Sequence, residues 1–184
     1  MHKAIQIFLL SVCVCLFSFA QNEKDAMSWN HSKHLTWSDF KGKPNQNSGA
    51  AASTASGISF GFSVRRVGNR ITQFTTNVEC LFYPYESWVK QESANNHILG
   101  HEQLHFDITE LHTRKFRKQI SQMKPSSNIK SRLNTLYKSI SKASHDMQKL
   151  YDKETNHSIN KKMQAYWQTF INKELKKLET YKSK

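Results

Sequence analysis

The spacing of apolar residues changes once along this chain, and that change limits what it can fold into. Between residues 58 and 82 apolar side chains recur at every second position, and Gly68-Asn69 interrupts the stretch. Alternation of this kind predicts two strands, each with one buried face, joined by a turn into a β-hairpin. The alternating residues are Ile58, Phe60, Phe62 and Val64 before the turn, and Phe74, Thr76, Val78, Cys80 and Phe82 after it.

After residue 93 the apolar period becomes that of amphipathic helices. We predict one helix over residues 98–120, a second over 129–150 and a third from about residue 159. Strands followed by helices predict an α+β fold in a single domain. The residues expected on the apolar faces are Leu104, Ile108 and Leu111 in the first helix, Ile129, Leu133, Leu136, Ile140, Ala143, Met147 and Leu150 in the second, and Met163, Tyr166, Phe170 and Leu178 in the third.

Residues 1–20 have the pattern of a secretory signal peptide. His2 and Lys3 precede an apolar stretch over residues 4–19, and Ser18-Phe19-Ala20 is a small-x-small cleavage site. A membrane anchor is the alternative, but the apolar stretch is short for a membrane span. We therefore expect a secreted protein, periplasmic or extracellular, whose mature domain is 21–184 and has no transmembrane segment.

The cysteine content and the net charge limit which kinds of protein and partner fit this chain. Of the three cysteines only Cys80 lies outside residues 1–20, so an internal disulfide is excluded and core packing must hold the fold. The formal net charge is +13. For an exported protein this charge favours an anionic envelope surface as partner over nucleic acid. We prefer the interpretation that the lysines only keep the helices soluble, because they are scattered along the predicted helices rather than clustered.

The pentapeptide HEQLH at residues 101–105 carries the strongest chemical signal. On a helix, His101 and His105 project about 40° apart on one face, so both imidazoles can reach one metal ion. Catalytic zinc takes three protein ligands plus a water. Glu102 lies at the edge of the same face, where we expect it to act as general base on that water. The alternative is a chance pattern on an ordinary structural helix.

The third ligand is expected downstream of this helix. His112 shares the histidine face but lies roughly 10 Å farther along a continuous helix, which fits packing better than ligation. Glu110 points to the opposite face and is expected in solvent. The polar segment YDKETNHS, residues 151–158, lies between two apolar-striped helices and is either a site or a plain capped turn. Its candidate ligands, in order of preference, are His157, Asp152 and Glu154.

The sequence also resembles a bacterial family of predicted secreted zinc-dependent proteases, first catalogued as a domain of unknown function. Four segments carry the resemblance and together cover most of residues 35–170. The segments are LTWSDFKGKP, AAASTASGISF, HILGHEQLHFDITEL and YDKETNHSINKKMQAYW.

The resemblance implies export to the cell envelope and a metallopeptidase-like fold. It also implies that His101, Glu102 and His105 are the metal and catalytic positions. Asp107 matches the family's extended motif, for which we expect a supporting role beside the ligands. His157 matches a downstream histidine of the family, which favours it as the third ligand.

The sequence thus predicts a zincin-like α+β metallopeptidase. His101, His105 and His157 are expected to bind Zn²⁺ and Glu102 to be the base, with a peptide or protein substrate lying as an extra strand beside the hairpin. A non-peptide amide of the cell wall would use the same site. The rival function is a non-catalytic, basic envelope-binding protein with a structural or vestigial metal site. Candidates for an oxyanion stabiliser are Tyr83, Tyr85, Tyr151 and His97.

Overall fold

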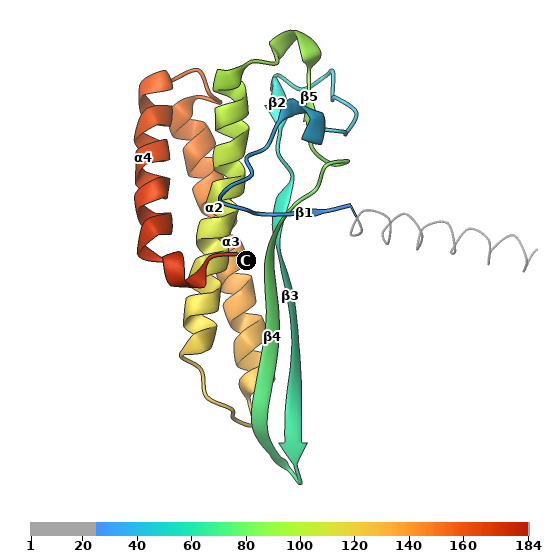
Figure 1. Cartoon of the computed structure of the whole chain (residues 1–184), viewed down its shortest axis with the longest axis vertical. Helices are drawn as coiled ribbons and strands as arrows, with labels where there is room; N and C mark the ends of the chain where they lie inside the picture. Colours follow the sequence, from blue (N-terminus) through green and yellow to red (C-terminus); the bar gives the residue numbers. More distant parts are fainter. Residues whose placement is uncertain (1–24, 184) are drawn as a thin grey trace, which may run out of the picture.

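The computed structural model describes residues 25–183, and within them two small antiparallel sheets precede three long helices (Figure 1). The predicted α+β class is therefore confirmed, whereas the signal-peptide prediction for residues 1–20 lies outside the described residues. No helix of the described part is long and apolar enough to cross a membrane. The elements are β1 (Met27–Ser28), β2 (Ala52–Ser53), β3 (Ser56–Val67), β4 (Arg70–Phe82), β5 (Trp88–Val89), α2 (Asn96–Ser121), α3 (Ile129–Thr155) and α4 (Lys161–Lys177).

The predicted hairpin is confirmed as β3 and β4. The two strands pair antiparallel from Ser56 opposite Phe82 to Val67 opposite Arg70, with a register shift between Arg65 and Arg66. Gly68 takes the turn with a φ of 57°, a left-handed conformation that glycine adopts without steric cost. The first sheet has the order β1-β4-β3, and β2 pairs with β5 in the second.

Helix α2 lies between the hairpin and the other two helices (Figure 1). Its N-cap is Asn95, whose side chain accepts a hydrogen bond from the Ile98 N–H. Because strands pack on one side and helices on the other, α2 is buried on most of its circumference. A first core cluster includes Leu104, Ile108 and Leu111 of this helix; a second joins its Phe116 to the hairpin and to the start of α3.

Helices α3 and α4 differ from the predictions in detail. Helix α3 continues to Thr155, so the polar segment 151–158 is largely its last turns, and Tyr151 within it is fully buried. On α4 the buried side chains are Gln164, Trp167, Ile171 and Leu175, whereas Tyr166 is 59% exposed. The prediction for Tyr166 was therefore wrong, as was the prediction for Leu150 of α3, which is 45% exposed. The Trp167 indole donates a hydrogen bond to the Glu154 carboxylate at 2.8 Å, and this larger ring takes the core-facing position.

Glu110 was also predicted wrongly, because it is fully buried and forms an ion pair. Its Oε1 accepts from Nε of Arg114 at 2.8 Å, and both side chains are at most 1% exposed. Arg114 further donates to the Leu175 carbonyl at 2.6 Å, and the Ser183 main-chain N–H donates to Glu110 at 2.9 Å. A buried charge needs such partners. The pair therefore ties α2 to the end of α4 and to the C-terminal segment.

We predict that Arg114→Met lowers the free energy of unfolding by about 3–5 kcal/mol, because it leaves the Glu110 carboxylate buried without its cation. Denaturant unfolding measures this change. The matched control is Lys142→Met, which breaks the exposed i,i+4 pair with Asp146. Solvent screens that pair, so its loss should leave stability nearly unchanged. Equal effects of the two substitutions would contradict a structural role for the buried pair.

Candidate metal centre

Two histidines of α2 and one aspartate of α3 direct ligand atoms at a common position. The Nε2 atoms of His101 and His105 lie 3.2 Å apart. Oδ1 of Asp152 lies 3.2 Å from the first and 3.0 Å from the second. The three side chains are 5%, 14% and 32% exposed, in that order, so the group opens to solvent on the Asp152 side. These residues form a group that could hold a metal ion.

The antiparallel packing of α2 against α3 brings the group together. One turn forward on α2, from His101 to His105, corresponds to one turn back on α3, from Asp152 to Gln148. Tyr151 fills the space between the helices. Its ring stacks on His101 with centroids 4.6 Å apart and meets His105 edge-on at 4.9 Å. The two imidazoles are therefore held by an aromatic wall on one side.

Gln148 determines which nitrogen of His105 carries the hydrogen. Its Nε2 lies 2.9 Å from the His105 carbonyl oxygen, which can only accept, so Nε2 must donate there. Its Oε1 consequently faces Nδ1 of His105, and that nitrogen must donate to it. Nε2 of a neutral His105 then presents a lone pair to Asp152. Such a hydrogen bond to the outer nitrogen is what orients a metal-binding histidine.

The charges of the group require a cation among the three atoms. Burial raises the pKa of Asp152, but its hydrogen bonds with His101 and His105 outweigh burial, so the pKa lies well below its ordinary value. Burial lowers the pKa of His105, yet Asp152 and the charge of Glu102 raise it above its ordinary value overall. With a neutral His105, the lone pair on its Nε2 would face the carboxylate at 3.0 Å. Either protons or a metal ion must separate them.

The donor set fits zinc. Two imidazole nitrogens and one carboxylate oxygen are ligands that zinc accepts, and three protein ligands are typical of its catalytic sites. Tetrahedral ligands at roughly 2.0–2.1 Å from zinc would be about 3.3 Å apart. The separations of 3.2, 3.2 and 3.0 Å are close to that value. The three ligand atoms therefore have the mutual spacing of one face of a tetrahedral metal site.

Glu102 lies on α2 beside the first histidine, as the motif requires, and only 4% of it is exposed. Its carboxylate is near enough to raise the pKa of both His105 and Tyr151 electrostatically. Its main-chain oxygen accepts a hydrogen bond from the Thr54 hydroxyl at 3.2 Å. The structure therefore places a carboxylate near the candidate ligands, and the segment after β2 in contact with the main chain of the same residue.

His157, the preferred third ligand, lies just outside the group of three. Its Nδ1 is 3.8 Å from Oδ1 of Asp152 and its side chain is 71% exposed. It belongs to a turn in which Asn156, His157 and Ser158 have φ angles of 46°, 51° and 73°. Left-handed backbone in three consecutive non-glycine residues is strained, and strain of this kind concentrates at functional sites. His157 remains a prediction, while Asp152, the second choice, is in the group.

Three other candidates have different surroundings. Glu154 accepts from Trp167 on α4. Asp107 accepts from the Trp29 indole at 2.8 Å and so anchors the N-terminal segment to α2. His112 is buried, and neither ring nitrogen has a hydrogen-bond partner among the described residues. Burial, with Lys115 nearby, lowers the pKa of His112 to about 4, as expected for a neutral packing residue.

Of the four candidates for an oxyanion stabiliser, Tyr151 is nearest to the histidines, but its hydroxyl lies 3.4 Å from the His101 carbonyl. Nε2 of His97 lies 2.6 Å from the Ser158 carbonyl. Tyr85 is 51% exposed and lies under Lys41. The ring of Tyr83 lies against Gly57. The structure brings none of these side chains into the group of three.

Sequence reasoning missed Gln148. The available signal was its position four residues before Asp152, which places both side chains on one face of α3. The pattern that can be searched for is a glutamine and an aspartate four residues apart on one helix, opposite two histidines four residues apart on another. The pairing of the two helices, however, is known only from the fold.

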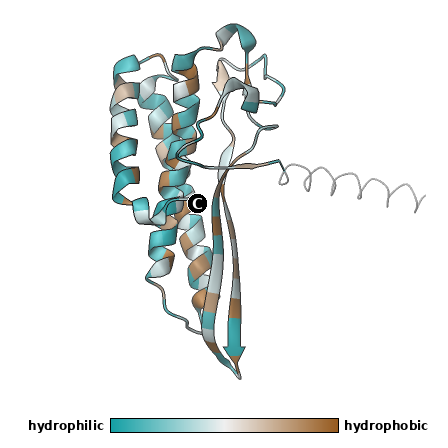
Figure 2. Ribbon diagram, in the orientation of Figure 1, coloured by the Kyte–Doolittle hydropathy of each residue, from teal (hydrophilic) through white to brown (hydrophobic). Residues whose placement is uncertain are grey.

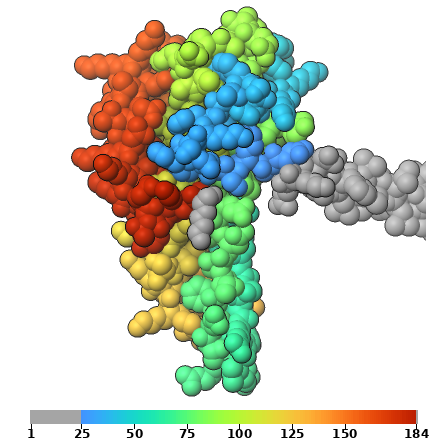
Figure 3. All heavy atoms as spheres, viewed as in Figure 1, coloured from blue at the N-terminus to red at the C-terminus, as the bar shows by residue number. Residues whose placement is uncertain are grey.

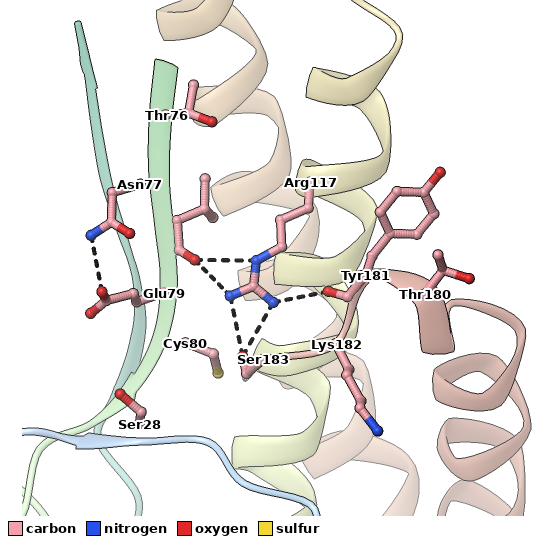
Figure 4. Close-up of a pocket in the computed structure, with 11 residues that line it drawn as sticks. Ser28, Thr76, Asn77, Glu79, Cys80, Arg117, Thr180, Tyr181, Lys182 and Ser183 are labelled. Carbon is pink, nitrogen blue, oxygen red and sulfur yellow. Dashed lines mark hydrogen bonds between the residues drawn. The ribbon is translucent and has the colours of Figure 1, made fainter.

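A separate cavity of about 540 Å³ lies between β4, α2 and the C-terminal segment (Figure 4). The Arg117 guanidinium crosses it and donates to the carbonyls of Val78 at 2.6 Å and Tyr181 at 2.9 Å. These contacts join the hairpin to the C-terminal segment. No member of the candidate metal centre lines this cavity, so the two are distinct features.

Comparison with known proteins places the chain in a family without giving it an activity. No curated protein and no solved structure matches it. A family model matches residues 32–158, which include all three members of the candidate metal centre. By this match the chain belongs to the family described as "Bacterial protein of unknown function (DUF922)".

Proposed function

We propose that this protein is a secreted, zinc-dependent metallopeptidase with a zincin-like site on α2. The observation that carries the proposal is the convergence of His101, His105 and Asp152, with ligand atoms 3.0–3.2 Å apart. The glutamate beside the first histidine supports catalysis, because a purely structural site has no need of it. Structural zinc sites also close with four protein ligands, whereas this group has three. Export is supported by the pattern of residues 1–20.

The chain's own residues have distinct roles in this proposal. His101, His105 and Asp152 would hold the ion, and Gln148 keeps the lone pair of His105 directed at it. A divalent zinc ion would supply Lewis acidity, which polarises a carbonyl and acidifies a water. Glu102 accepts the proton that the attacking water loses and delivers it to the leaving amine. Tyr151 keeps solvent away from the inner side of the imidazoles.

The substrate strand is better assigned to β2 than to the hairpin. The Ile58 carbonyl of β3 accepts a hydrogen bond from the Tyr137 hydroxyl of α3 at 3.1 Å, so α3 covers that edge. Within residues 25–183, β2 pairs with β5 alone, and Thr54 beside it contacts the Glu102 main chain. An extended peptide would therefore add to β2 and pass the candidate base.

We predict that the mature chain, residues 21–184, binds one zinc ion, and that His105→Ala and Asp152→Ala each abolish binding. His157→Ala should retain the ion, because His157 lies outside the group. Metal content of the purified proteins, measured by mass spectrometry after zinc reconstitution, tests this. Zinc retained in Asp152→Ala but lost in His157→Ala would reassign the third ligand. No zinc in the unaltered chain would refute the metal site.

We predict that Glu102→Gln keeps zinc and thermal stability but lowers peptide hydrolysis by roughly 10²–10⁴-fold, because the amide cannot accept the proton. Hydrolysis would be followed by mass spectrometry on a peptide library. Glu92→Gln, at an exposed glutamate before α2, is the control and should change nothing. Full activity of Glu102→Gln would exclude Glu102 as base. Zinc binding without hydrolysis by the unaltered chain would favour the non-catalytic alternative.

We predict that Gln148→Leu weakens zinc binding by about 10–100-fold while the protein stays folded, because Nδ1 of His105 loses its acceptor. Competition with a chromophoric chelator measures the affinity. Gln168→Leu on α4, whose amide contacts only Asn172 among the described residues, is the matched control and should have unchanged affinity. Equal affinities of the two variants would show that Gln148 does not orient the ligand.

A further inference from the structure

Carboxylates are absent from one end of the molecule. The sequence has no Asp or Glu between Asp39 and Glu79, and none between Glu110 and Asp146. The fold packs parts of these two stretches together, because the outer hairpin joins the end of α2 and the start of α3 in the second core cluster. We call this end the basic pole: residues 58–78 of the hairpin, 115–121 of α2, the connecting loop, and 129–138 of α3.

Eight cations of the basic pole are exposed and form no ion pair within residues 25–183, whereas Lys115 and Arg117 are partly buried and Arg117 pairs with Glu110. Arg65, Arg66 and Arg70 flank the hairpin turn, and all three side chains are exposed. No ion pair is formed by any of them within residues 25–183. Lysines and an arginine of the helices add to the charge around them. These are Lys118, Lys124, Lys130, Arg132 and Lys138, which are also exposed and form no ion pair in that range.

The hairpin turn carries an apolar side chain at its projecting end. Val67 is 64% exposed, whereas the aromatic rings of this end pack on one another, as Phe60 does on Phe116 and Tyr137. The turn extends beyond the ends of α2 and α3 (Figures 1 and 3). Figure 2 shows hydrophilic residues at the end of β3, with hydrophobic residues adjacent to them. The basic pole is thus a convex, cationic tip with one aliphatic residue at its apex.

We propose that the basic pole docks on the surface of an anionic phospholipid bilayer. Arginines hydrogen-bond phosphate headgroups, and cations near an anionic membrane surface each add to binding. Val67 would enter the interfacial region, as apolar residues between cationic side chains do in membrane-surface segments. A single-stranded nucleic acid would need exposed aromatic rings on which bases stack, and the rings at this end are used for packing.

This docking does not depend on the proposed metallopeptidase activity. His105 and Lys118 are separated by thirteen residues of one continuous helix, which corresponds to about 20 Å. A protein held at the basic pole therefore keeps its candidate metal centre away from the bilayer. Membrane binding would persist in a variant that has lost zinc, so failure of one proposal leaves the other intact.

The test is flotation of the mature chain with vesicles of phosphatidylcholine alone or mixed equally with phosphatidylglycerol. We expect binding to the mixed vesicles only, and weaker binding at high salt. The triple variant Arg65→Gln, Arg66→Gln and Arg70→Gln should bind roughly 100-fold more weakly, at about fivefold for each charge removed. Circular dichroism should be unchanged, because the three side chains are exposed.

The control removes the same charge elsewhere, with Lys162→Gln, Lys173→Gln and Lys176→Gln on the exposed side of α4. It should bind nearly as tightly as the unaltered chain. Equal losses in the two triple variants would mean that net charge alone drives binding, and would overturn the basic pole as the docking site. No binding to mixed vesicles would also overturn the proposal. So would binding to a single-stranded oligonucleotide that displaces the vesicles.

Discussion

The burial of α2 is the constraint on which the rest of this structure depends. A helix enclosed by a hairpin on one side and two helices on the other must satisfy its polar side chains within the protein. Three of these side chains reach different neighbours: Asp107 reaches Trp29 in the N-terminal segment, Glu110 reaches Ser183 near the C-terminus, and His105 reaches Gln148 on α3. The polar contacts of this one helix therefore fix the positions of the N-terminal segment, the C-terminal segment and α3.

The two histidines of the HEQLH motif are a different case. The Nε2 atoms of His101 and His105 converge on the Asp152 carboxylate. The Tyr151 ring contacts both imidazoles, and Gln148 accepts a hydrogen bond from Nδ1 of His105. Elsewhere in α2, as in the pair of Glu110 with Arg114, a buried charge has its opposite charge in contact. The difference between these two clusters, a few turns apart on one helix, separates a structural ion pair from a group that could hold a metal ion. It is the physical basis for the function proposed above.

The spacing of apolar residues was sufficient to predict which segments form strands, which form helices, and where the hairpin lies. These features depend on residues that are close together in the sequence. It failed where a side chain's partner is distant in sequence. Glu110 was expected in solvent because its face is polar locally, and only the C-terminal segment and Arg114 make it a buried position. For the site, HEQLH gave two candidate ligands and a base. The third depends on how far α3 continues, and Asp152 joined the group because that helix runs on to Thr155.

The position of β3 at the edge of its sheet has a consequence for self-association. A long edge strand presents unpaired N–H and C=O groups, which can recruit a strand from another molecule. Here the outer part of β3 contains a register shift between Arg65 and Arg66, beyond the point where Tyr137 covers the edge. Irregular pairing and like charges both discourage a second copy from extending the sheet. The same arginines thus protect the exposed edge from aggregation while the protein is still free in solution.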